Sequence, residues 1–176
     1  MTDFQNSAGP PYDARAVANL MLERLWEIGS SATQMQLYKM VYFAHGWHLA
    51  SDRGPLVQQQ FEAWDYGPVV RILRDAFKCF GKREITQKAE RLDIFTGELT
   101  DVEPVSDPDE IAFIQNIVDA YHRYDGWHLS EITHEEGSPW DEIWNSREPV
   151  GKLALRIDDE AICSYFVRLP QRFAMH

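Results

Sequence analysis

The chain has 176 residues, of which 44% are hydrophobic and 26% charged, and its formal net charge is −11. A chain of this length can bury most of its apolar surface in one core, so we expect a single domain. The negative charge opposes general binding to nucleic acid, because phosphates attract a basic surface. No apolar run approaches the roughly 18 residues of a membrane-spanning helix, so no membrane segment is expected.

The cysteines and the N-terminus indicate the compartment. Cys79 and Cys163 lie far apart and outside any CxxC motif, which suits a reducing environment. The first residues lack the basic start and the apolar stretch of a signal peptide. We therefore expect a cytoplasmic protein.

Charge is unevenly distributed along the chain. From Arg71 to Arg91 there are seven basic and three acidic residues, whereas eight acidic residues and no Lys or Arg lie between Arg91 and Arg123. A molecule with two oppositely charged regions suits protein partners of either sign. Two solvated faces would produce the same pattern, and the sequence leaves both interpretations open.

Helix boundaries are clear in the first fifty residues. Asp13 is a suitable N-cap for a helix that ends at Gly29, with apolar residues at helical spacing. Thr33 and Gln36 have the spacing of a capping box at the start of a second helix. This second helix, up to Ala50, is apolar nearly all round, which is typical of a central, buried helix.

The middle of the chain combines a short strand with a helix. Residues Gln60–Tyr66 predict a strand, and Gly67-Pro68 predict the start of a helix that ends at Gly81. The outward face of this helix carries basic residues spaced three and four apart, so they form one basic stripe: Arg71, Arg74 and Lys78.

The second half of the chain predicts one hairpin and four helices. The hairpin is expected around Thr96-Gly97. The helices are the one capped by Asp107, then Leu129–Glu136, a helix starting at Ser138-Pro139, and residues 158–169. Together the elements predict a mainly α fold: a single compact domain of about seven helices with a small antiparallel β element, on the border of the α+β class.

Histidines beside carboxylates raise the question of a metal site. His45 and His48 lie three apart on the second helix, and His134 precedes Glu135. The spacing is not H-E-x-x-H, and a hydrogen-bonded core histidine is the commoner outcome on an apolar helix face. The chain has neither a nucleophile elbow nor a glycine-rich phosphate loop. We expect no metal, no cofactor and no catalytic activity, with a metal-dependent enzyme as a minor alternative.

Four motifs occur in order along the chain: YDARAVANLML, MQLYKMVYFAHGWHLA, GPLVQQQFEAWDYGPVV and WHLSEITHEEGSPW. They resemble the Panacea domain family over about Tyr12 to Trp144. We therefore expect a flexible N-terminal tail (1–11) and a Panacea-like helical domain (12–146). A C-terminal extension (147–176) follows, with a helix that packs on the same domain.

The resemblance implies a bacterial, cytoplasmic, non-enzymatic antitoxin that binds a cognate toxin. In one type of member the antitoxin is a proteolytic adaptor that delivers the toxin to the ClpXP protease, and we predict this type. Neutralisation by direct binding alone is the nearest alternative. A transcriptional autoregulator that places the basic region on DNA is another, although nucleic-acid binding is not expected from the net charge.

Candidate partner-binding residues come from the basic stripe and from the aromatic part of the motifs, because Trp, Tyr and Arg contribute most to interface energies. The candidates are Trp64, Tyr66, Arg71, Arg74, Lys78, His134 and Trp140. Each tryptophan would also suit a place in the core, and the family supplies no catalytic residues.

Overall fold

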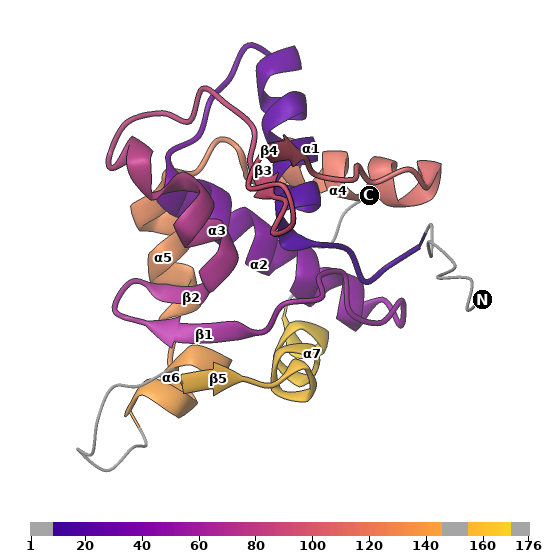
Figure 1. Ribbon diagram of the computed structural model, residues 1–176. Coiled ribbons are helices and arrows are strands. Elements are labelled where there is room, and N and C mark those ends of the chain that lie inside the picture. Colours follow the sequence, from indigo (N-terminus) through magenta and orange to yellow (C-terminus); the bar gives the residue numbers. More distant parts are fainter. Residues whose placement is uncertain (1–8, 146–154, 170–176) are drawn as a thin grey trace.

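Helix α2 (Gln34–Ala50) forms the centre of the fold (Figure 1). The structure is a computed structural model that describes residues 9–145 and 155–169. Every α2 residue from Gln36 to His48 is buried, which confirms the central position expected from its apolar character.

Six further α-helices of the described residues pack around α2 and a small sheet. They are α1 (Ala14–Glu27), α3 (Arg71–Phe77), α4 (Pro108–Tyr121), α5 (Gly126–Thr133), α6 (Pro139–Asn145) and α7 (Asp159–Arg168). A short 3-10 helix, η1 (Lys78–Phe80), extends α3. The expected N-caps Asp13 and Asp107 are confirmed, since each carboxylate accepts a backbone N–H of the first turn. None of the described helices has the length and apolar character needed to cross a membrane.

The expected capping box of α2 forms only in part. The Thr33 hydroxyl accepts a hydrogen bond from the Gln36 backbone N–H at 3.4 Å. The Gln36 side-chain amide instead donates to the carbonyls of His122 and Tyr124, at 3.1 and 2.8 Å. It therefore joins the start of α2 to the connection between α4 and α5.

Helix α7 crosses α2 at Gly46. A Cβ on Gly46 would lie 2.3 Å from the Phe166 ring, so only glycine permits this approach. The Phe166 ring meets the rings of Tyr42, Phe43 and Trp47 edge to face. The last helix thereby packs against the aromatic core around α2.

Two small antiparallel sheets complete the described residues. In the larger sheet, β1 (Phe61–Trp64) lies between β2 (Gly67–Val70) and β5 (Leu155–Ile157), which comes from far along the chain. The smaller sheet is the expected hairpin, β3 (Glu90–Leu92) and β4 (Leu99–Asp101). The seven α-helices and small sheets within residues 9–145 and 155–169 confirm the mainly α fold on the α+β border.

The helix start expected at Gly67-Pro68 is wrong. These two residues begin β2, which pairs antiparallel with β1 so that Gly67 lies opposite Trp64, and α3 starts only at Arg71. Gly67 has a φ of +100°, which lets the chain turn back from β1 immediately. The pairing with β1 outweighs the helix-starting preference of the proline.

The helix expected at Leu129–Glu136 also differs. Helix α5 begins three residues earlier, at Gly126, and ends at Thr133. Asp125 is its N-cap, since its carboxylate accepts the His128 backbone N–H at 2.8 Å. The earlier start brings Trp127 onto the helix, which matters for the surface described next.

Candidate partner-binding surface

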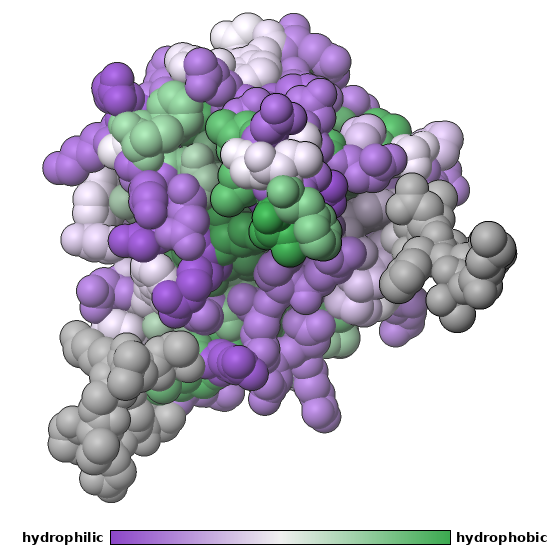
Figure 2. Space-filling model, in the orientation of Figure 1, coloured by the Kyte–Doolittle hydropathy of each residue, from purple (hydrophilic) through white to green (hydrophobic). Residues whose placement is uncertain are grey.

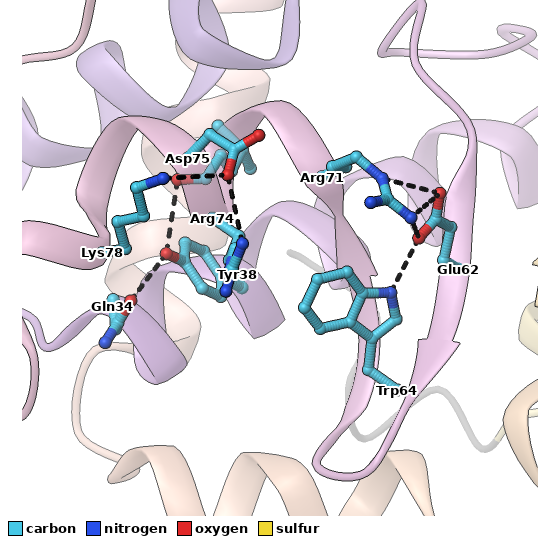
Figure 3. Close-up of polar contacts among 9 residues, drawn as sticks. Gln34, Tyr38, Glu62, Trp64, Arg71, Arg74, Asp75 and Lys78 are labelled. Atoms are coloured by element: carbon cyan, nitrogen blue, oxygen red, sulfur yellow. Dashed lines mark hydrogen bonds and ion pairs between the residues drawn. The ribbon is translucent and has the colours of Figure 1, made fainter. Parts of the chain in front are cut away.

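The indole of Trp64, at the end of β1, lies beside two arginines of α3 (Figure 3). The guanidinium carbons of Arg71 and Arg74 lie 5.7 and 5.6 Å from the ring centroid, within the range of cation–π attraction. The Trp64 Nε1–H donates to the Glu62 carboxylate at 2.8 Å, and Arg71 pairs with the same carboxylate at 2.9 Å. A half-buried ring is thus held in place by neighbouring charges.

The basic stripe is exposed, and its charge is partly balanced by carboxylates. Arg74 and Lys78 both pair with Asp75, at 3.3 and 3.6 Å, and Arg71 pairs with Glu62 (Figure 3). The two pairs with Asp75 are exposed and contribute little to stability, because water screens them, whereas the Glu62 side chain is only 13% exposed. The stripe therefore presents three cationic side chains to solvent.

The turn between β1 and β2 is held by side chains from α5 and α6. Three consecutive backbone carbonyls each lie opposite a side-chain donor: Trp64 faces Trp140 Nε1 at 2.7 Å, Asp65 faces His134 Nε2 at 3.3 Å, and Tyr66 faces Ser130 Oγ at 2.9 Å. This arrangement gives the motif WHLSEITHEEGSPW a physical role, since its polar side chains match the carbonyls of the motif WDYGP.

Among these donors, His134 and Trp140 also contact each other. Their ring centroids lie 3.8 Å apart, edge to face. The His134 Nδ1 lies 2.5 Å from the Ser130 carbonyl, so both ring nitrogens face backbone carbonyl oxygens. Trp140 is only 6% exposed. It therefore supports the turn from inside the fold.

A lysine lies buried beneath the same turn. The Lys39 ammonium, on α2, donates to the Pro68 carbonyl at 3.0 Å, and burial lowers its pKa to about 7. A Cβ on Gly67 would lie 2.4 Å from the Thr133 hydroxyl and 2.8 Å from the Lys39 nitrogen. The turn consequently accepts no side chain at position 67.

The turn presents one aromatic pair to solvent. Tyr66 is 58% exposed and Trp127 of α5 is 60% exposed, and their ring centroids lie 5.6 Å apart, edge to face. The sequence candidates do not include Trp127, because the helix expected from Leu129 leaves Trp127 outside any predicted element. Asp125, three residues before His128, was the available signal for an earlier start.

We define the aromatic–basic surface as Trp64, Tyr66, Arg71, Arg74 and Trp127. It has two parts, which the β1–β2 turn connects: Trp64 lies beside the two arginines of α3, and Tyr66 lies beside Trp127. Of the seven candidates, Lys78 continues the surface along η1. His134 and Trp140 lie behind it, where they hold the backbone.

The helical histidines have hydrogen-bond partners. His45 Nδ1 accepts the Val57 backbone N–H, and its Nε2 lies 2.9 Å from an Asp159 oxygen at the start of α7. His48 lies 3.1 Å from the Glu110 carboxylate of α4. Within residues 9–145 and 155–169, no three His, Cys, Asp or Glu side chains are grouped as metal ligands would be.

The chain belongs to the family described as Antitoxin SocA-like, Panacea domain, whose model matches residues 37–141. The matched residues include both motifs that build the β1–β2 turn. Among individual proteins, the chain is similar to Antitoxin SocA of Caulobacter vibrioides (strain NA1000 / CB15N). The two are 36% identical over 154 residues, which covers 88% of this chain and 82% of that protein. No solved structure matches the chain.

Proposed function

We propose that this protein is an antitoxin that binds a cognate toxin protein and, as a proteolytic adaptor, delivers it to the ClpXP protease. The observation that carries the proposal is the similarity to Antitoxin SocA along most of both chains. The residues that the family model matches, 37–141, include the β1–β2 turn, α3 and α5, which carry the aromatic–basic surface.

The aromatic–basic surface has the chemistry of a protein interface. Exposed Trp, Tyr and Arg side chains supply a large part of the binding energy in known interfaces. The backbone beneath Tyr66 is already fixed by Ser130, His134 and Trp140, so ordering it on binding costs little entropy. In this proposal His134 and Trp140 act through the turn that they hold.

An adaptor needs two contacts on one rigid body. Binding of the toxin and of the protease to the same molecule raises the local concentration of toxin at the protease, so modest affinities on each side suffice. The uneven charge distribution supports two distinct contacts, because the acidic segment and the basic stripe attract partners of opposite sign.

The test is co-expression with the product of the neighbouring gene, as the candidate toxin, in hosts with and without ClpX. We expect rescue of growth, and a toxin half-life that is shortened only when both this protein and ClpX are present. The double variant Tyr66→Ser/Trp127→Ser should lose rescue, whereas Val167→Ser, an exposed apolar residue on α7, should keep it.

The outcomes separate the two routes of neutralisation. Rescue and complex formation that are equal in both hosts, with a long-lived toxin, would establish direct binding alone and remove the adaptor step. Absence of any complex, together with toxicity that this protein does not relieve, would refute the antitoxin proposal as a whole.

A further inference from the structure

The β3–β4 hairpin exposes large apolar side chains outside the aromatic–basic surface. Phe95 is 93% exposed and Ile94 is 82% exposed, both in the tip, and Leu92 and Leu99 are exposed on the strands. In Figure 2 hydrophobic residues gather near the centre of the face, where Figure 1 places this hairpin. A group of four large apolar side chains on one exposed hairpin marks an interaction site more often than a chance feature.

The tip is held by its own hydrogen bonds. The Asp93 carboxylate accepts the backbone N–H groups of Phe95 and Thr96 at 2.8 and 3.1 Å, and these bonds lower the pKa of Asp93. The Gly97 N–H donates to the Asp93 carbonyl, and the Asp93 N–H to the Glu98 carbonyl, each at 2.8 Å. Ile94 and Phe95 are thus presented on a preorganised loop.

The base of the hairpin is attached to α1. The Asn19 side chain bonds both backbone groups of Ala89, accepting its N–H at 2.7 Å and donating to its carbonyl at 2.9 Å. Arg15 donates to the Glu90 carbonyl at 3.4 Å. These hydrogen bonds therefore fix the base of the hairpin to α1.

One face of the hairpin combines apolar and acidic side chains. Leu92 lies opposite Leu99, and two positions along the same face Glu90 lies opposite Asp101. Like charges directly opposite each other repel, and a cation from a partner would remove this repulsion. Lys88 interacts with Asp101, and Arg91 with Asp93, yet residues 88–103 carry five acidic and two basic side chains, so the patch is apolar with an acidic border.

We propose that this hairpin is a docking element for the cognate toxin, whose contact surface is an apolar pocket bordered by Lys or Arg. The inference rests on the proposed function. Both routes of neutralisation require a toxin contact, whereas only the adaptor route requires a protease contact, so this preorganised apolar patch is assigned to the toxin. The acidic border opposes an anionic membrane surface as the occupant.

The test is calorimetric titration of the full-length chain with the purified product of the neighbouring gene, the candidate toxin. The double variant Ile94→Ser/Phe95→Ser should raise the Kd about 100-fold, because two central apolar anchors are lost. Glu90→Gln/Asp101→Asn should raise the Kd about 10-fold at low salt and flatten its salt dependence. All four side chains are exposed, so thermal melting should show unchanged folding.

Val167→Ser is the matched control, since it removes an exposed apolar side chain on α7 and should leave the Kd unchanged. If the wild-type chain binds the toxin and Ile94→Ser/Phe95→Ser binds within twofold of it, the hairpin assignment is overturned while the antitoxin proposal stands. If the wild-type chain does not bind the toxin, the proposed function fails and the assignment falls with it.

Sedimentation of the same variants tests a competing occupant. We expect the wild-type chain and Ile94→Ser/Phe95→Ser to have the same oligomeric state. A wild-type dimer that the double variant dissociates, with the toxin Kd unchanged, would show that a second copy of this chain occupies the hairpin and would overturn the proposal.

Discussion

The β1–β2 hairpin and the β3–β4 hairpin are both short antiparallel pairs, yet they are stabilised in different ways. The first turn is held from outside by α2, α5 and α6, whose side chains bond the carbonyls of four of its residues. The second turn is held from within by Asp93. A turn held by side chains of neighbouring helices and a turn held by its own aspartate should respond differently to the same substitution.

Glycine replacement should produce the largest contrast. Gly67→Ala combines a positive φ with a Cβ at 2.4 Å from the Thr133 hydroxyl, so we expect the free energy of unfolding to fall by about 3 kcal/mol. Gly97→Ala meets nothing within 4 Å, and only the φ of +74° should cost about 1 kcal/mol. Urea denaturation of both variants measures the difference in the free energy of unfolding. Equal losses would contradict the conclusion that side chains of α2, α5 and α6 hold the first turn.

The stability of the protein should depend on pH through Lys39, which lies beneath the β1–β2 turn. Lys39 loses its proton near pH 7 in the folded chain, but keeps it up to its ordinary pKa of 10.5 in the unfolded chain. The unfolded state therefore binds more protons in this window, and stability should rise by about 2 kcal/mol from pH 7 to pH 9. Urea denaturation across this range tests it. Lys39→Met should remove the rise, and a rise that persists in Lys39→Met would assign it to other groups.

Substitutions at Trp140 and Trp127 should distinguish a tryptophan that supports the β1–β2 turn from one that is exposed on it. Trp140→Phe keeps an aromatic ring but removes the donor to the Trp64 carbonyl, so we expect a loss of about 1 kcal/mol. Trp127→Phe changes an exposed ring and should alter stability by less than about 0.5 kcal/mol. Thermal melting of both variants checks this order, and a larger loss at Trp127 would place the structural role on α5 instead.

An equally small effect on stability is expected in the basic stripe. Arg74→Gln removes an exposed cation that pairs with Asp75 and lies beside Trp64, and the free energy of unfolding should change by less than about 0.5 kcal/mol. Chemical denaturation measures this change. A much larger loss of unfolding free energy would show that Arg74 stabilises the position of the Trp64 indole and is not simply a solvent-exposed cation.

The sequence predicted those features whose cause is local. Helix ends at Asp13, Thr33 and Asp107 follow from capping side chains, and the central place of α2 follows from its apolar character on all sides. The β3–β4 hairpin was predicted because its turn residues lie within a few positions of one another. The resemblance to the Panacea domain family, which the comparisons confirm, came from four motifs of the same local kind.

Only the tertiary structure decided what depends on residues far apart in the chain. Pairing with β1 placed Gly67 in a strand rather than at a helix start, and β5 has too few residues for a detectable period. Trp64, Tyr66 and Trp140 are all aromatic motif residues, yet one is half-buried, one exposed and one enclosed. Residue type alone does not predict these different degrees of burial, because burial depends on which helices pack over the turn.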